Sequence, residues 1–209
     1  MTAEDKTVVV WDVGNVLIEW RPERYYDRRI GREARERFFA EVPIEAANLA
    51  VDAGAPFPDA IRDLKREHRE WAEAIDMWCD DWLTICAPPI YRSVRILRAL
   101  TKRGVPCHAL TNFGAETWRT ARAEYDFLGW FDGTTVSAHL GAVKPDAAIY
   151  EAVEYATERK GGDLIFTDDR KDNIAAAEDR GWRTHLFEGP DGWAERLVEA
   201  GLLTSAEAS

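Results

Sequence analysis

Residues 8–17 read VVVWDVGNVL, an apolar run that ends in a single carboxylate, Asp12, and continues through glycine and asparagine. Four apolar residues in succession are typical of a strand that is buried on both faces, as strands are in parallel sheets. Ligands of parallel α/β proteins bind at the carboxyl ends of the strands. The stretch therefore predicts a parallel α/β fold and makes Asp12 the first candidate functional residue.

The remainder of the chain from residue 91 onward alternates between helical periodicity and short apolar runs. We expect strands at 7–12, 105–110, 163–168 and 182–187, with a further short strand inside 131–140. The helical patterns between them cover 91–103, 115–126, 146–159, 171–180 and 191–201. Strands that alternate with helices predict a doubly wound parallel sheet with helices on both faces, a Rossmann-like α/β core.

The segment between the first strand and residue 91 has a different pattern, without a convincing strand. Helical periodicity covers three stretches, 22–41, 43–52 and 58–85. Trp71, Trp78 and Trp82 recur in the last stretch at helical spacing, which indicates core packing; the alternative is that one ring lines a substrate pocket. We expect residues 1–17 and 91–209 to form the α/β core and residues 18–90 to form an inserted α-helical cap.

The composition limits the partners and the compartment. The 209 residues carry a formal net charge of −11, which argues against nucleic acid and anionic membranes but not against small anionic substrates. The three cysteines match no metal-binding spacing, so we expect reduced core residues of a cytoplasmic protein. The segment 1–6 lacks the apolar centre of a signal peptide, and no apolar run approaches a membrane span. The sequence does not indicate an oligomeric state.

Residues whose side chains can take part in catalysis or metal binding lie at the carboxyl ends of the expected strands. Asp12 ends the first strand, and the others are Thr111, Asn112, Lys144 and the pair Asp168-Asp169. Each has a structural alternative, such as a turn cap, a helix N-cap or a surface charge. Three carboxylates at one sheet edge repel each other unless a cation joins them, and Mg²⁺ prefers oxygen ligands. A carboxylate beside a cation, a lysine and a hydroxyl suits nucleophilic attack on phosphorus.

Four segments in order resemble the motifs of the haloacid dehalogenase-like hydrolase superfamily. They read WDVGNVL (11–17), LTN (110–112), VKPDAAIY (143–150) and FTDDRKDNIAAAEDRG (166–181), so the resemblance covers essentially the whole chain. The first motif, D-x-G-N-V, is similar to that of the bacterial sugar-phosphatase branch typified by α-D-glucose-1-phosphatase. The resemblance implies a Mg²⁺-dependent phosphomonoester hydrolase that forms an aspartyl-phosphate on Asp12, with a small phosphorylated metabolite such as a sugar phosphate as substrate.

The same resemblance implies a role for each matching residue. Asp12 would be the nucleophile and a Mg²⁺ ligand, together with the carbonyl of Gly14 and the carboxylate of Asp169. Asp168 would act on the metal through water or orient Lys144. Thr111 and Asn112 would hold the phosphoryl oxygens. Lys144 would bridge the nucleophile and the phosphate. Asn173 would brace the last loop.

Gly14 departs from the pattern of most phosphatases in the superfamily, which carry an aspartate there. That aspartate protonates the leaving oxygen, and a positioned acid or base contributes roughly 10²–10⁴-fold. We therefore expect a slow enzyme, or one that prefers leaving groups needing little protonation, such as anomeric, aryl or acyl phosphates. Glu19 and Glu23 are candidate substitutes because they are near in sequence. Trp20 and Arg21 are expected to bind substrate, because they directly follow the catalytic strand edge.

Two other functions remain open at the level of sequence. The first is a 2-haloacid dehalogenase of the same fold, which would attack carbon without a metal; the acidic pair Asp168-Asp169 argues for a cation instead. The second is a catalytically impaired binding protein on the same scaffold, suggested by the missing carboxylate at Gly14. The retained nucleophile, lysine and acidic pair favour an enzyme.

Overall fold

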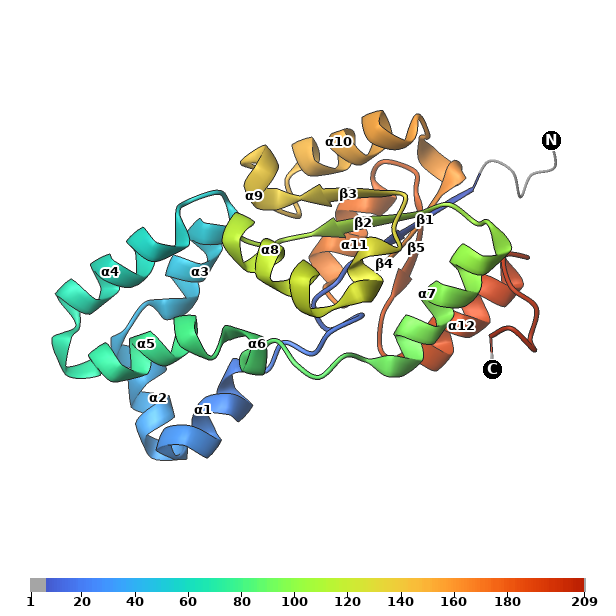
Figure 1. Cartoon of the computed structure of the whole chain (residues 1–209). Helices are drawn as coiled ribbons and strands as arrows, with labels where there is room; N and C mark the ends of the chain where they lie inside the picture. The colour runs from blue at the N-terminus through green and yellow to red at the C-terminus, as the bar shows by residue number, and fades with distance from the viewer. Residues whose placement is uncertain (1–6, 209) are drawn as a thin grey trace.

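The chain forms a five-stranded parallel sheet with the strand order β3-β2-β1-β4-β5 (Figure 1). This computed structural model describes residues 7–208; residues 1–6, on which the expectation about a signal peptide rests, and residue 209 lie outside the described part. The strands are β1 (Val8–Trp11), β2 (Cys107–Thr111), β3 (Gly133–Val136), β4 (Leu164–Asp168) and β5 (Arg183–Leu186). All four pairings are parallel, so the predicted doubly wound sheet is confirmed.

Helices cover both faces of the sheet because successive β1 residues point to opposite sides. Val8 and Val10 pack with residues of α10 and α11, whereas Val9 and Trp11 belong to the core beneath α7 and α12. Trp11 meets Trp193 of α12 edge to face, with ring centroids 5.5 Å apart. The covering helices are α7 (Tyr91–Arg103), α8 (Ala115–Glu124), α9 (Ser137–Leu140), α10 (Ala147–Thr157), α11 (Lys171–Glu178) and α12 (Pro190–Glu199).

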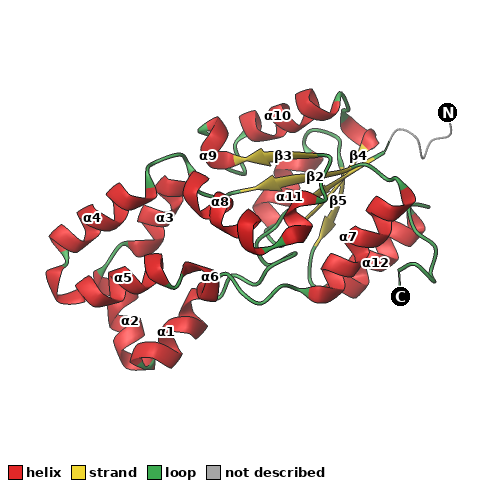
Figure 2. Ribbon diagram, viewed as in Figure 1, coloured by secondary structure: helices red, strands yellow, loops and turns green. Residues whose placement is uncertain are grey.

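The segment between β1 and α7 contains helices and no strand among its described residues, and it lies to one side of the sheet (Figure 2). We call these helices the helical insert: α1 (Pro22–Ile30), α2 (Arg32–Glu41), α3 (Ile44–Asp52), α4 (Phe57–Glu67), α5 (Ala72–Asp80) and α6 (Trp82–Ile85). The expected helix at 22–41 is two helices, because Gly31 adopts φ +82° and turns the chain. The expected helix at 58–85 is interrupted after Glu67 and at Asp81.

The interruptions of the last helical pattern do not disturb its apolar face. Trp78 and Trp82 are buried and Trp71 packs against the core, as core packing predicts; Trp78 and Trp82 also border the cavity described below, so the two interpretations do not exclude each other. One cysteine departs from expectation: Cys79 is exposed on α5, whereas Cys86 and Cys107 are buried, and all three are free thiols. Among the described residues, no helix has the length and apolar character needed to cross a bilayer.

The strand order brings the expected site residues together. β1 lies between β2 and β4, with Trp11 in register with Ala109 on one side and Thr167 on the other. The three strands therefore end at the same edge, where Thr111 and Asp168 are the last strand residues and Asp12 directly follows β1. The Asp12 backbone N–H donates to the carbonyl of Thr167 at 3.0 Å, which fixes the nucleophile candidate against β4.

Candidate active site

Lys144 forms the centre of the polar cluster at the sheet edge. Its Nζ lies 2.8 Å from Asp12 Oδ1 and 2.6 Å from Asp168 Oδ2, and it donates to the carbonyl of Leu110 at 3.0 Å. All three charged side chains are buried. Burial opposes the charge of the ammonium, but the two carboxylates outweigh it and raise the pKa of Lys144. The lysine therefore stays protonated beside Asp12.

The single positive charge of Lys144 does not balance the negative charges of the three carboxylates in the cluster. Burial raises the pKa of Asp12 above its usual range, and the charges of Asp168 and Asp169 add to this effect while Lys144 opposes it. Burial also raises the pKa of Asp169. Asp12, Asp168 and Asp169 each offer an oxygen within 4.8 Å of the others, so a cation could bind among them. An all-oxygen donor set of this kind fits Mg²⁺.

Neighbouring donors hold both oxygens of the Asp168 carboxylate. Besides Lys144, it accepts hydrogen bonds from Asn173 Nδ2 at 2.9 and 3.0 Å and from the Arg170 backbone N–H at 2.8 Å. The side chain has no exposed surface. These contacts agree with the expected orienting role for Asp168 and with the bracing role expected for Asn173.

The residues that follow β2 divide into two kinds. The Asn112 side chain bonds the backbone of Lys144 twice, accepting from its N–H at 2.8 Å and donating to its carbonyl at 3.1 Å. Asn112 therefore holds the backbone of Lys144, and it also lines the cavity described below, so its expected contact with phosphate stays a prediction. The Thr111 hydroxyl is fully buried, lines the cavity described below, and has no hydrogen-bond partner among residues 7–208. It remains available to an oxygen of a bound phosphoryl group.

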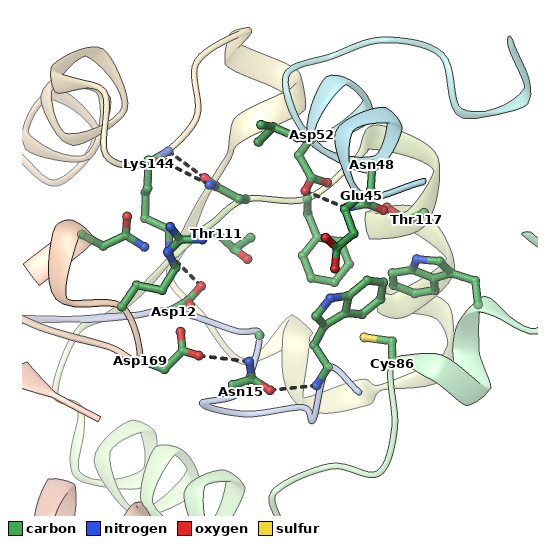
Figure 3. A pocket seen from close by; sticks show the side chains of 18 of the residues that line it. Asp12, Asn15, Glu45, Asn48, Asp52, Cys86, Thr111, Thr117, Lys144 and Asp169 are labelled. Atoms are coloured by element: carbon green, nitrogen blue, oxygen red, sulfur yellow. Dashed lines mark hydrogen bonds and ion pairs between the residues drawn. The ribbon is translucent and has the colours of Figure 1, made fainter. Parts of the chain in front are cut away.

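A cavity of about 540 Å³ opens from this edge toward the helical insert (Figure 3). Its sheet side carries the polar cluster, and its insert side carries three tryptophan rings among polar side chains. Trp20 packs against Trp78 and Trp82, with ring centroids 5.6 and 6.2 Å apart. The lining residues from the insert and its connections are Trp20, Glu45, Asn48, Leu49, Asp52, Trp78, Trp82 and Cys86. Trp20 therefore lies where the sequence suggested, and two rings of the tryptophan pattern also line the cavity.

Asn15 connects the two sides of the cavity and was not among the residues expected from sequence. Its Nδ2 donates to Asp169 Oδ2 at 3.0 Å, and its Oδ1 accepts from the Trp20 backbone N–H at 3.0 Å and from Arg21 Nη1 at 3.1 Å. The residue adopts φ +54°, a conformation in which asparagine is enriched. The Gly-Asn pair after a buried strand was the available signal, because it marks a tight turn.

The other charged residues near the first strand lie away from this cavity. Arg21 is exposed and lines a separate hollow of about 400 Å³ together with Arg24. Glu19 is paired with Arg24 at 2.7 Å, and Glu23 is exposed to solvent on α1. Neither glutamate lines the cavity, so neither is placed to replace the carboxylate missing at Gly14.

Gly14 itself borders the cavity and faces open space. A Cβ atom built on this glycine meets no atom of the described structure within 4 Å. Packing among residues 7–208 therefore does not require glycine here, and a larger side chain would extend into the cavity.

The family of the chain follows from its sequence as well as from this geometry. The sequence profile of the haloacid dehalogenase-like hydrolases matches residues 6–181, so the chain belongs to this hydrolase family. A sesquiterpene phosphatase, astK of Aspergillus oryzae, is 34% identical over 95 residues. That match spans 46% of this chain and 48% of the relative, so the two proteins are comparable over about half their lengths.

Solved structures share the fold over nearly the whole chain. The HAD family enzyme bt-2542 of Bacteroides thetaiotaomicron superimposes with a TM-score of 0.71 at 20% identity, covering 91% of this chain and 98% of that chain. Its complex with magnesium and inorganic phosphate gives a TM-score of 0.64 at 22% identity, covering 86% and 92% of the two chains. L-2-haloacid dehalogenase of Xanthobacter autotrophicus reaches 0.60 at 14% identity, covering 96% and 85%.

Proposed function

We propose that this hydrolase is a Mg²⁺-dependent phosphomonoesterase that acts on a small phosphorylated metabolite through an aspartyl-phosphate on Asp12. The observation that carries the proposal is the buried Lys144 ammonium between Asp12 and Asp168, with the carboxylate of Asp169 beside them. Lys144 favours the ionised form of Asp12 against the effect of burial, and the three carboxylates leave an oxygen-lined place for a cation. Both are requirements for attack by a carboxylate on phosphorus.

The metal site would consist of Asp12, Asp169 and the backbone carbonyl of Gly14, with Asp168 acting through water. Mg²⁺ bound there supplies positive charge that offsets the charges of the carboxylates and the phosphoryl oxygens. Thr111 donates its free hydroxyl to one phosphoryl oxygen, and Lys144 contributes its charge beside Asp12. Asn112 acts indirectly by holding the backbone of Lys144.

The reaction on these residues has two halves. An oxygen of Asp12 attacks phosphorus, the bond to the leaving oxygen breaks, and the departing alkoxide takes its proton from solvent because Gly14 offers none. Water then attacks the phosphorus of the aspartyl-phosphate, which releases inorganic phosphate, a proton and the Asp12 carboxylate. Without a positioned acid, leaving groups of low pKa are favoured.

The organic part of the substrate would bind between the sheet edge and residues 18–90, which we propose as the cap of a core made of residues 1–17 and 91–209. The wall of Trp20, Trp78 and Trp82 supports a substrate with apolar surface. Aromatic rings also pack on the apolar faces of sugars, so the sugar-phosphate expectation is compatible with this wall. The relative named as a sesquiterpene phosphatase supports a more apolar group.

The two alternatives account less well for the site. A metal-independent dehalogenase has no use for three carboxylates within 4.8 Å of each other, and a binding protein has no use for a lysine aimed at a nucleophile. The shared fold with L-2-haloacid dehalogenase does not distinguish them, because fold alone does not determine the reaction.

The decisive experiment measures phosphate release from p-nitrophenyl phosphate and a panel of phosphorylated metabolites, with and without Mg²⁺. We expect activity that needs Mg²⁺, that EDTA abolishes and that falls to the uncatalysed rate in Asp12→Asn. Asp179→Asn, an exposed carboxylate at the end of α11, is the matched control and should retain activity. Chloride release from 2-chloropropionate in EDTA would instead establish the dehalogenase, and phosphate release by Asp12→Asn would refute the nucleophile.

A further inference from the structure

Helix α3 presents two carboxylates to the cavity opposite the polar cluster. Glu45 and Asp52 are seven residues apart, so they lie on one face of the helix, and both line the cavity (Figure 3). Glu45 is exposed at the mouth, whereas Asp52 is half-buried and accepts a hydrogen bond from Asn48 Nδ2 at 3.0 Å. Within residues 7–208, neither carboxylate forms an ion pair.

The positive charges of the cavity are all at its other end. Among the described residues that line it, the cations are Lys144 and Arg170, and each is already paired. Lys144 contacts Asp12 and Asp168, and Arg170 Nη2 lies 2.8 Å from Asp172 Oδ2. A substrate that spans the cavity therefore has its phosphate near the cations and its organic part near Glu45 and Asp52. Organic parts that carry a carboxylate or a second phosphate are repelled by this end.

The same end of the cavity is aromatic. Trp20, Trp78, Trp82 and Phe113 line it together with the two carboxylates. The face of an indole ring carries negative charge density and attracts a cation within about 6 Å of its centroid, and tryptophan is the strongest of the aromatic side chains in this respect. A wall of indole rings beside unpaired carboxylates is suited to one chemical group in particular, an organic ammonium.

We propose that the organic part of the substrate carries an alkylated ammonium group, which binds between Glu45, Asp52 and the tryptophan rings while its phosphate binds at Asp12. The substrate class is thus a phosphomonoester of an amino alcohol. The inference rests on the proposed phosphatase function and assigns the specificity of that same site.

The environment of Asp52 agrees with a cationic ligand. Burial raises the pKa of Asp52 to about 7, with only the backbone amide of Gly114 opposing the shift. No cation of the described protein compensates this carboxylate, whereas a bound ammonium would do so. Asn48 and Gly114 hold the carboxyl in place without neutralising it.

The test compares phosphocholine with 3,3-dimethylbutyl phosphate, which has the same shape but a neutral quaternary carbon in place of nitrogen. For the wild-type enzyme we expect kcat/KM to be at least about tenfold higher for phosphocholine than for the neutral ester, because one favourable contact between a cation and an aromatic ring stabilises binding by about this factor. Glu45→Gln and Asp52→Asn keep a hydrogen-bond acceptor and remove the charge, so each should lower this ratio several-fold. Glu73→Gln, which removes an exposed carboxylate of α5 outside the cavity, should leave the ratio unchanged.

A second measurement does not depend on the variants or on turnover of either ester. Choline should inhibit hydrolysis of p-nitrophenyl phosphate by the wild-type enzyme at a concentration at least about tenfold lower than 3,3-dimethylbutanol. Equal inhibition, or equal kcat/KM for the two esters, overturns the ammonium assignment. A preference for a neutral terpenoid phosphate, which is also an alkyl ester, over phosphocholine overturns it as well. The proposed phosphatase function fails separately, by Mg²⁺-independent or Asp12-independent activity.

Discussion

Asp52 is a carboxylate whose burial has a measurable effect on folding. Its pKa is raised from 3.8 to about 7, so the native protein disfavours the ionised form. Between these two values the unfolded chain has lost the Asp52 proton while the native chain retains it. The contribution of Asp52 to stability is therefore full below pH 3.8 and is lost as the pH rises through 7. Asp52→Asn removes the ionisation but keeps an oxygen for the Asn48 amide.

The size of the effect follows from the shift. One pKa unit corresponds to about 1.4 kcal/mol, so ionised Asp52 costs roughly 4 kcal/mol at a pH well above 7. At pH 5 most of the native proteins still hold the proton, and the cost is about 1.5 kcal/mol. We therefore expect the stability of Asp52→Asn relative to the wild type to increase by about 2–3 kcal/mol between pH 5 and pH 8.

The assay is urea denaturation of both proteins at several pH values from 5 to 8, followed by intrinsic fluorescence of the buried tryptophans. Other titrating groups, Asp12 included, are present in both proteins and cancel in the difference. Asp80→Asn, which removes an exposed carboxylate of α5, is the control and should give a difference independent of pH. If the free energies of unfolding of Asp52→Asn and the wild type changed in parallel with pH, ionisation of Asp52 would cost the native protein no stability, and the reasoning would be refuted.

Three further predictions concern the sheet edge. Gly14→Asp should raise kcat for alkyl phosphates by about tenfold or more and have less effect on aryl phosphates, measured by phosphate release, because open space admits a proton donor. Gly114→Ala should lower the free energy of unfolding by about 1–3 kcal/mol in urea, because its Cβ would overlap Val51 Cγ1; an unchanged midpoint would contradict the close packing. Lys144→Met should abolish activity and lower the free energy of unfolding by about 3–5 kcal/mol at pH 7, since it leaves the buried Asp12 unpaired. Thermal unfolding at pH 5 should show a smaller loss of stability.

The sequence predicts those parts of the fold and site that depend on local sequence patterns. Asp12 and Asp168 stand at the ends of apolar runs, and the parallel arrangement of those runs brings strand ends to one edge. Lys144 is predictable by its place before a helix near that edge, although the side chain that positions it, Asn112, looks like a substrate ligand in sequence. The two hydrogen bonds between the Asn112 side chain and the backbone of Lys144 leave no recognisable pattern in the sequence.

The parts that the sequence does not predict depend on how the helical insert packs. Glu45 and Asp52 lie on a helix whose direction is set by the turn at Val42 and Pro43 and by the segment after Asp52, and only the folded arrangement brings them over the cavity. Arg21 depends on the same packing: it is exposed and lines the separate hollow with Arg24, and its contact with substrate stays a prediction.

Asn15 has a consequence for how new specificities arise on this scaffold. One amide group holds the carboxylate of Asp169 with its nitrogen and the backbone of Trp20 with its oxygen. We therefore expect a displacement of Trp20 to move the carboxylate of Asp169 through this one side chain. Under the proposed function, substrate range and the strength of cation binding at Asp169 are then expected to change together. Asn15→Ala would uncouple them, and a screen for altered substrate range has a reason to begin from that variant.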